Sequence, residues 1–239
     1  MSVRAVVFDL DGTLLDTLAD VAKAANAALR DGGFPEHPLA DYRFLLGGGV
    51  RRLFAAALPA DARTPEQINS RISAFQTHYQ RNWNSTTRPY DGIPELVREL
   101  RTRGLTLSVL SNKPHDFTRA CITAHFSGEE IEPAAGTPGG DRHELGPAIG
   151  PFTFVIGQRA DVPPKPDPAG AIEIAAALGV EPANVLYLGD TSIDMETAQG
   201  AGMQPIGVLW GFRDRAELEG SGAETVIAAP GELLELLPG

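Results

Sequence analysis

Two aspartates separated by one residue lie near the N-terminus, in the segment Asp9-Leu10-Asp11-Gly12-Thr13. Alternate side chains of an extended segment point to the same side, so these two carboxylates are expected to lie close together. Like charges repel each other unless a positive group lies between them. The spacing therefore predicts a site for a divalent cation or a phosphate group. The alternative is an ordinary Asp-Gly turn with two solvated acids.

Three further polar motifs follow apolar segments or precede a helical one. They are Ser111-Asn112-Lys113, Lys165-Pro166-Asp167-Pro168 and the segment from Gly189 to Asp194. Taken singly, they have ordinary explanations as a turn serine, a solvated lysine and an acid at a helix N-terminus. Parallel sheets, however, bind ligands at the carboxyl ends of their strands, where all four motifs can face one crevice. The order of the motifs therefore indicates one shared site.

Short runs of valine, leucine, isoleucine and phenylalanine predict the strands that position these motifs. The expected strands are residues 3–8, 105–110, 152–156, 185–188, 205–209 and 225–227. Helical segments lie between most of them, and those at 95–103 and 169–178 are each preceded by a proline and followed by a glycine. This alternation predicts an α/β fold with a Rossmann-like, mostly parallel sheet flanked by helices.

The alternation of strands and helices stops between Thr17 and Arg88, where apolar residues recur only at helical spacing. An insert that leaves the sheet after the first strand is expected to cover the crevice at the strand ends. We therefore expect an α/β core of residues 1–15 and 89–239, with an inserted all-helical cap domain of residues 16–88.

A glycine triplet in the expected cap, Gly47 to Gly49, is followed by Arg51 and Arg52. Glycine lets the backbone approach a ligand closely, and arginine pairs well with a carboxylate. Gly48 and Arg51 are therefore candidates for binding part of a substrate. The alternative is a loop between two helices with solvated arginines.

The composition of the 239-residue chain, 43% hydrophobic and 21% charged, is that of a globular protein. Its net charge of −11 and the lack of a basic run argue against a nucleic-acid partner, and no apolar run is long enough for a membrane span. A single cysteine, Cys121, and the lack of a signal-peptide pattern predict a cytoplasmic protein. The Gly/Pro-rich segment Ser127 to Pro151 predicts a long surface loop of unknown role.

The four motifs together resemble those of the haloacid dehalogenase superfamily of phosphohydrolases, and in particular the phosphoglycolate phosphatase type. The resemblance covers almost the whole chain. It rests on DxDGT at 9–13, SNK at 111–113, KPxP at 165–168, GDxxxD at 189–194 and the helical insert after the first motif. It implies a magnesium-dependent phosphatase that hydrolyses a small phosphate ester through an aspartyl-phosphate.

The resemblance also implies roles for the reacting groups. Asp9 would be the nucleophile, and Asp11 would serve first as the general acid and then as the general base. Lys165 would offset the charge of Asp9 and of the phosphoryl oxygens. The residues expected to hold the nucleophile or the phosphoryl oxygens are Thr13, Ser111 and Asn112.

Magnesium is the cofactor that the resemblance implies, and this ion prefers hard oxygen ligands. By the family pattern, the carboxylates of Asp9 and Asp190 and the backbone carbonyl of Asp11 would bind Mg²⁺. Asp194 would orient the water ligands of the ion without contacting the ion itself. A monomer and a homodimer are both compatible with the sequence.

Three other functions share parts of this pattern. A sugar phosphomutase similar to β-phosphoglucomutase would carry the same motifs, and only retention of the phosphate by the product would separate it from a hydrolase. A 2-haloacid dehalogenase also uses the first aspartate but has no need of Asp11, Asp190 or Asp194. A non-catalytic binding module would be expected to have lost a motif acid or lysine, and none is substituted here. The sequence therefore favours the phosphatase.

Overall fold

The computed structural model describes residues 2–128 and 145–237 of the chain. It divides into two compact units, residues 1–14 with 89–239 and residues 15–88. Most of the loop predicted over Ser127 to Pro151 lies outside the described residues. No helix in the described ranges combines the length and the apolar character that a bilayer span requires.

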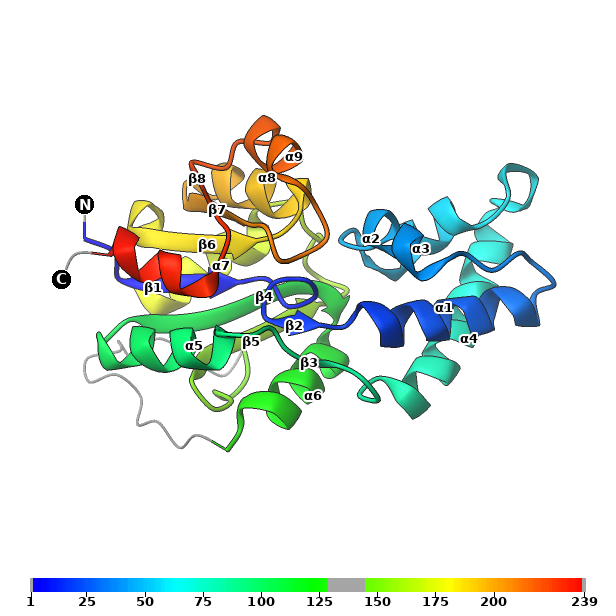
Figure 1. The fold of residues 1–239 in the computed structure, drawn as a ribbon, viewed down its shortest axis with the longest axis horizontal. Helices are drawn as coiled ribbons and strands as arrows, with labels where there is room; N and C mark the ends of the chain where they lie inside the picture. Colours follow the sequence, from blue (N-terminus) through cyan, green and yellow to red (C-terminus); the bar gives the residue numbers. More distant parts are fainter. Residues whose placement is uncertain (1, 129–144, 238–239) are drawn as a thin grey trace. The chain divides into compact units, whose positions relative to one another are not determined.

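The described residues of the larger unit form a six-stranded parallel sheet in the order β5-β4-β1-β6-β7-β8 (Figure 1). Every strand that the sequence predicted is present, which confirms the expected α/β fold. β1 pairs with β4 on one side and with β6 on the other, so the residue after β1 lies at the middle of the sheet edge. The strands are β1 (Ala5–Phe8), β4 (Thr106–Pro114), β5 (Phe152–Gln158), β6 (Val185–Gly189), β7 (Gln204–Val208) and β8 (Thr225–Ile227).

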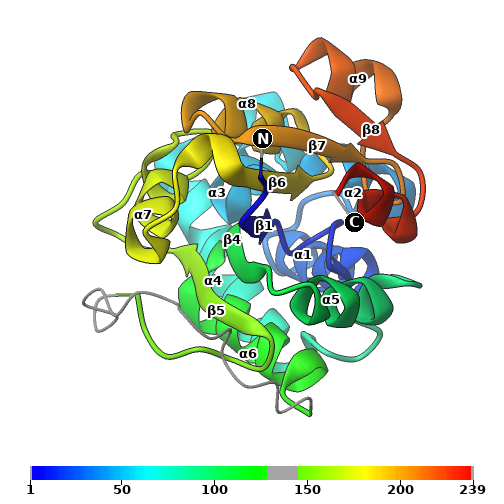
Figure 2. The ribbon, with the colours of Figure 1, turned by 90° about the vertical axis from the view of Figure 1, so that its left-hand side faces the viewer.

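Helices cover both faces of this sheet, with α7 and α8 on one face and α5 and α6 on the other (Figure 2). Strands in this position are buried on both sides, and all four residues of β1 are fully buried. Gly179 ends α7 in a left-handed conformation with φ +65, which glycine adopts without steric cost. The α-helices are α5 (Ile93–Thr102), α6 (His115–Phe126), α7 (Ala169–Leu178), α8 (Ser192–Gly200) and α9 (Arg215–Gly220). Two 3₁₀-helices, labelled η, are η3 (Pro182–Asn184) and η4 (Pro230–Leu236).

β4 is longer than the predicted strand 105–110, because it continues through Ser111, Asn112 and Lys113 to Pro114. Its pairing with β5 shifts register between Leu110 and Pro114. Such an irregularity redirects the side chains of the residues it contains. The polar motif therefore lies in the irregular end of β4, where the sequence shows no strand-like alternation.

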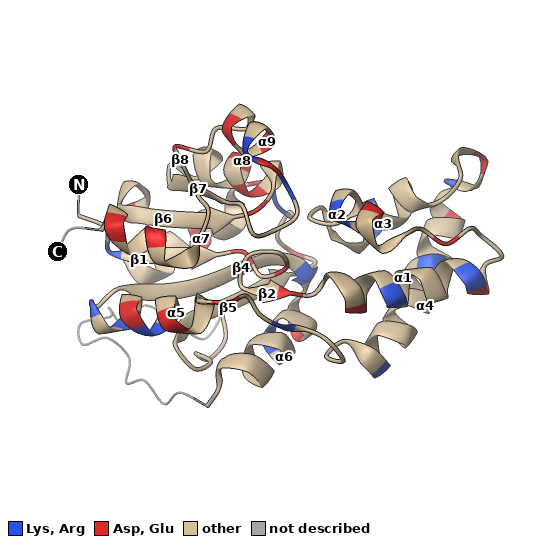
Figure 3. Cartoon of the chain, in the orientation of Figure 1, with Lys and Arg blue, Asp and Glu red and all other residues tan. Residues whose placement is uncertain are grey.

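The smaller unit, residues 15–88, consists of helices between two short strands. The strands β2 (Leu15–Asp16) and β3 (Arg88–Pro89) pair with each other at the two ends of the insert, and two residues each are too few to leave a strand pattern in the sequence. Basic residues occur on all four of its α-helices (Figure 3). The helices are α1 (Leu18–Asp31), η1 (Leu39–Asp41), α2 (Tyr42–Leu45), α3 (Gly49–Ala57), η2 (Ala60–Ala62) and α4 (Pro65–Asn82).

A buried carboxylate joins the beginning of this insert to its end. Asp20, in the first turn of α1, is only 2% exposed. It accepts hydrogen bonds from the backbone N–H and the hydroxyl groups of both Thr86 and Thr87, at 2.8–2.9 Å. Burial by itself raises the pKa of Asp20, but these hydrogen bonds outweigh burial and hold the pKa below its ordinary value.

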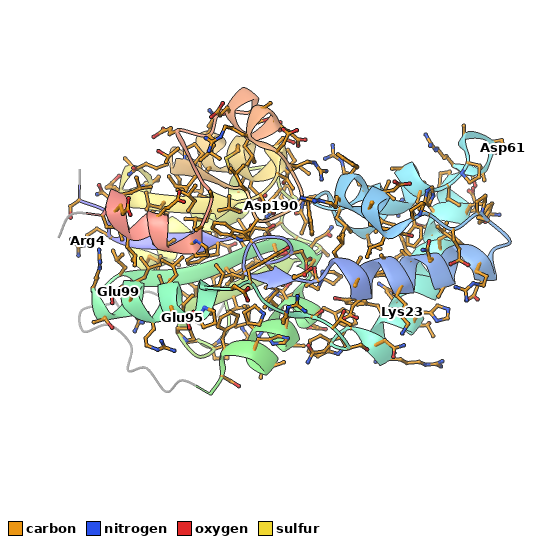
Figure 4. All side chains as sticks on the ribbon, in the orientation of Figure 1. Arg4, Lys23, Asp61, Glu95, Glu99 and Asp190 are labelled. Atoms are coloured by element: carbon orange, nitrogen blue, oxygen red, sulfur yellow. The ribbon has the colours of Figure 1, made fainter. Side chains whose placement is uncertain are left out.

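Replacing Asp20 by alanine is expected to lower the free energy of unfolding by about 3 kcal/mol or more, because buried donors lose a charged acceptor. Urea denaturation measures the loss, and Asp61→Ala at an exposed aspartate of η2 serves as the control (Figure 4).

The contribution of Asp20 to stability should also depend on pH. A carboxyl group whose pKa is lower in the folded state than in the unfolded state stabilises the fold at pH values above its unfolded pKa. The stability difference between wild type and Asp20→Asn should therefore narrow below about pH 4. A difference that stays constant down to about pH 2 would contradict this linkage.

Candidate active site

The sequence motifs meet at the C-terminal end of the central strands. Asp9 follows β1, and its backbone N–H continues the pairing by donating to the carbonyl of Leu188 in β6 at 2.9 Å. Asp190 follows β6 directly (Figure 4). Lys165 comes from the segment that precedes α7 and reaches the same place. Asp9 and Lys165, which are 156 positions apart in the chain, thus contact each other.

Lys165 joins two of the predicted acids. Its Nζ lies 2.8 Å from Asp9 Oδ1 and 2.6 Å from Asp194 Oδ1, and all three side chains are buried. Burial lowers the pKa of Lys165, but the charges of Asp194 and Asp9 overcome this effect and raise the pKa well above its ordinary value. Lys165 is therefore protonated and donates to the carboxylate proposed as the nucleophile.

Asp190 is held by donors on both of its oxygens. Thr13 Oγ1 donates to Asp190 Oδ1 at 3.2 Å, and the backbone N–H of Phe212 donates to Oδ2 at 2.7 Å. Asp190 is fully buried, and burial raises its pKa well above the ordinary value, with a further contribution from the charges of Asp194 and Asp9. Thr13 therefore orients an acid that was predicted as a metal ligand, and it does so from within the first motif.

Within the described residues, Asp9, Asp190 and Asp194 form a buried group in which one carboxylate oxygen of each residue lies within 4.8 Å of those of the other two. Their exposures are 5%, 0% and 1%. Burial raises the pKa of Asp9 to about 7, even though Lys165 favours the ionised form. Ionisation of all three acids at neutral pH therefore requires more positive charge than Lys165 alone supplies.

The charge balance of the described site fits a divalent cation. Two lysines, Lys113 and Lys165, make ion pairs with Asp9, Asp11 and Asp194, while Asp190 has only neutral donors in the hydrogen bonds described above. With all four carboxylates ionised, the two ammonium groups leave two negative charges unbalanced, and a divalent cation would favour this ionised state against the raised pKa values of Asp9 and Asp190. Hard carboxylate oxygens are also the ligands that Mg²⁺ prefers. Both the charge and the chemistry of these donors fit the predicted ion.

Asp194 has contacts that differ from those of the other acids. Its Oδ1 faces Lys165, while its Oδ2 accepts hydrogen bonds from Thr191 N at 3.1 Å and Thr191 Oγ1 at 2.8 Å. These bonds also cap the N-terminus of α8. Both oxygens thus accept hydrogen bonds from the protein, and the role of Asp194 toward the ion stays a prediction.

The second motif contributes two residues with separate contacts. Asn112 accepts a hydrogen bond from Lys165 N at 2.9 Å and donates to Lys165 O at 3.0 Å, so its side chain holds the backbone of the third motif. A phosphate contact from Asn112 would therefore use its backbone N–H. Ser111 Oγ accepts from Lys113 N at 3.2 Å, which uses the hydroxyl as an acceptor and not as a donor.

Sequence reasoning missed a segment after β7 that supports two of the motifs. Phe212 N donates to Asp190 as described, and Trp210 Nε1 donates to the carbonyl of Thr13 at 3.0 Å. Gly211 lies between them, and a methyl group there would overlap both the Asp190 side chain and the carbonyl oxygen of Gly12. The Trp-Gly-Phe sequence was visible, but nothing in its spacing indicated which acid it would contact.

Replacing Gly211 by alanine is expected to displace Asp190, and the predicted phosphatase should then need about tenfold more Mg²⁺, or still more, for half-maximal activity. Calorimetric titration with Mg²⁺ should show a parallel loss of affinity. Gly220→Ala is the matched control, because nothing lies within 4 Å of the added methyl group. Unchanged Mg²⁺ affinity in folded Gly211→Ala protein would show that this segment does not support the site.

The two candidate residues of the cap lie in the smaller unit. Gly48 precedes the first turn of α3, and Arg51 in that helix donates from Nη2 to Asn69 Oδ1 of α4 at 2.5 Å. This hydrogen bond lies at the exposed surface of the insert and uses one nitrogen of the guanidinium. Contact of Gly48 or Arg51 with a substrate stays a prediction.

Comparison with known proteins agrees with the motifs. A family model described as haloacid dehalogenase-like hydrolase matches residues 3–202. The chain is 31% identical over 238 residues to N-acetylmuramic acid 6-phosphate phosphatase of Pseudomonas aeruginosa, covering 99% of this chain and 96% of that protein. It is 27% identical over 235 residues to phosphoglycolate phosphatase of Aquifex aeolicus, covering 98% and 97%. A crystal structure of a proposed phosphoglycolate phosphatase from Lactobacillus delbrueckii subsp. bulgaricus matches with a TM-score of 0.85 at 28% identity, covering 100% of both chains. The chain belongs to the haloacid dehalogenase-like hydrolase family.

Proposed function

We propose that this protein is a magnesium-dependent phosphomonoester hydrolase that acts on a small phosphorylated metabolite through an aspartyl-phosphate on Asp9. The observation that carries the proposal is the buried group of Asp9, Asp190 and Asp194 at the ends of the central strands, with Lys165 paired to Asp9 and Asp194. In this proposal, residues 1–15 and 89–239 form the phosphatase core and residues 16–88 form the cap.

The first step transfers the phosphoryl group to the protein. A carboxylate oxygen of Asp9 attacks phosphorus, and the bond from phosphorus to the ester oxygen breaks. The leaving oxygen takes a proton from Asp11, which acts as the general acid. Lys165 and the hydroxyl of Ser111 bind the phosphoryl oxygens as their charge develops, together with the backbone N–H groups of Asp11 and Asn112.

The second step returns the protein to its starting state. Asp11, now ionised, takes a proton from a water molecule that attacks the phosphorus of the aspartyl-phosphate. Phosphate leaves, and Asp9 regains its carboxylate, which Lys165 stabilises by its hydrogen bond. The same carboxyl group thus serves as acid and then as base.

Magnesium would be held by Asp9, Asp190 and the backbone carbonyl of Asp11, and when bound it neutralises charge on the phosphoryl group. Thr13 and Phe212 fix the direction of the Asp190 carboxylate. Asp194 supports the ion site indirectly, because it accepts a hydrogen bond from Lys165, which also contacts Asp9.

The names of the relatives suggest the class of substrate. In phosphoglycolate and in N-acetylmuramic acid 6-phosphate, the phosphate is esterified to a hydroxyl group and the molecule also carries a free carboxylate. The core motifs account for the phosphoryl group, so another part of the chain must recognise the carboxylate. In our proposal Arg51 pairs with the substrate carboxylate, and the backbone at Gly48 allows close approach.

Phosphate release from a panel of phosphorylated two- and three-carbon acids, sugars and nucleotides tests this function. We expect Mg²⁺-dependent hydrolysis that a chelator abolishes, with phosphoglycolate hydrolysed at higher kcat/KM than 2-hydroxyethyl phosphate, which lacks the carboxylate. Conversion of a phosphosugar to an isomer that retains phosphate would instead identify a phosphomutase. Failure of the folded protein to release phosphate from every ester would favour a non-catalytic module.

A further inference from the structure

A second ion pair, which is only partly buried, lies beside the one made by Lys165. Lys113 Nζ lies 2.8 Å from Asp11 Oδ1 and 3.0 Å from Asp11 Oδ2, so it contacts both oxygens of the proposed acid and base. The sequence contains three lysines, Lys23, Lys113 and Lys165, among 20 basic residues. Two of these three lysines lie in the candidate site, and each contacts a different aspartate of the first motif.

Lys113 is held more firmly than a surface lysine. Its side chain is 5% exposed, whereas that of Asp11 is 22% exposed. The backbone is fixed on both sides, since Lys113 N donates to Ser111 Oγ at 3.2 Å and Lys113 O accepts from Thr118 Oγ1 at 3.1 Å. The irregular end of β4 therefore directs a rigidly held ammonium group at a more exposed carboxylate.

The position of Asp11 matters because proton transfer requires a carboxyl oxygen within hydrogen-bond reach of the leaving oxygen. An aspartate without this partner could rotate away, and repulsion from Asp9 would favour such rotation. We propose that Lys113 is a positioning residue that fixes the carboxyl group of Asp11 for proton transfer to the leaving group. The proposal rests on the proposed function. In the acid form of Asp11 one oxygen carries the proton and Lys113 Nζ donates to the other oxygen. The proton passes to the ester oxygen as the phosphorus–oxygen bond breaks, and Lys113, which keeps its own protons, stabilises the carboxylate left on Asp11.

A series of aryl phosphates separates this role from simple binding of phosphate. Esters of acidic phenols, such as 2,4-dinitrophenyl phosphate, need no proton to leave, whereas phenyl phosphate depends on the general acid. The ratio kcat/KM reports only the steps through cleavage of the first phosphorus–oxygen bond, so hydrolysis of the aspartyl-phosphate does not affect it. Lys113→Met is expected to lose about tenfold more kcat/KM on phenyl phosphate than on 2,4-dinitrophenyl phosphate.

Two variants serve as controls for this measurement. Lys113→Arg keeps the positive charge and should restore most of the kcat/KM that Lys113→Met loses on phenyl phosphate. Lys23→Met removes the third lysine, which is exposed on α1, and should change neither rate (Figure 4). Lys113→Gln replaces Lys113→Met if circular dichroism shows that the methionine variant does not fold.

The outcomes distinguish failure of the role proposed for Lys113 from failure of the proposed phosphatase function. A loss that grows as the leaving phenol becomes less acidic supports the role of Lys113. An equal loss on every ester would overturn it and assign Lys113 to phosphate binding or to folding. Unchanged kcat/KM on every ester would overturn it as well. Failure of the wild type to hydrolyse any of these esters in Mg²⁺ would instead remove the proposed function, and this inference with it.

Discussion

Replacing Asp9 by asparagine is expected to lower kcat for release of phosphate from p-nitrophenyl phosphate by about 10⁴-fold or more, as for other essential nucleophiles. Asparagine has nearly the same shape as aspartate but lacks the negative charge required for attack on phosphorus. Substrate-saturation kinetics at fixed Mg²⁺ measure the loss. Because the aryl ester needs no protonation to leave, the test isolates the nucleophile from the general acid.

The stability of Asp9→Asn separates a chemical effect from unfolding. Asp9 lies among buried acids, so removing its charge relieves repulsion from Asp190 and Asp194 while Lys165 keeps Asp194 as a partner. The variant should therefore unfold at the same urea concentration as wild type or at a higher one. Near-normal hydrolysis by this variant would refute the assignment of the nucleophile.

Removal of the divalent cation should have a comparably large effect. A chelator is expected to abolish hydrolysis of p-nitrophenyl phosphate, and Mg²⁺ should restore it, because two negative charges of the site have no counterpart among its lysines. Asp190→Asn should raise the Mg²⁺ concentration for half-maximal activity by about 100-fold or more, since even residues that only support a metal ligand contribute 10–100-fold.

Calorimetry gives a readout of this second prediction that does not depend on catalysis. Asp190→Asn should bind Mg²⁺ far more weakly than wild type, and Glu95→Gln, at an exposed acid of α5, should bind it normally (Figure 4). Full activity in the presence of excess chelator would contradict a role for the ion. Equal Mg²⁺ affinity in Asp190→Asn and wild type would contradict the assignment of this ligand.

The fold was largely predictable because its signals are local. Each strand of the sheet is a short apolar run, and α7 begins and ends where the sequence predicted, at Ala169 and Leu178. The alternation of strands and helices then leads to a parallel sheet whose carboxyl ends share one edge. This is why the convergence of Asp9, Lys165 and Asp190 could be expected from the sequence.

The contacts that orient the site could not be predicted in the same way. Lys113 and Asp11 are 102 residues apart, and their pairing depends on the irregular end of β4. Phe212 reaches Asp190 through a backbone N–H, which carries no information in the residue type. The strands β2 and β3 have two residues each and leave no periodic pattern. Sequence patterns thus indicate the chemical groups, whereas long-range packing decides which groups contact each other.

The most direct test of the central claim is to locate the covalent intermediate. Protein turning over a phosphate ester in Mg²⁺ is quenched with acid and treated with borohydride, which reduces an aspartyl-phosphate to homoserine. Trypsin should release the peptide from Ala5 to Lys23, which lies between Arg4 and the next lysine. We expect mass spectrometry to find homoserine at Asp9, and none in Asp9→Asn. Phosphate release with Asp9 unmodified, or with the phosphoryl group on another residue, would contradict the mechanism.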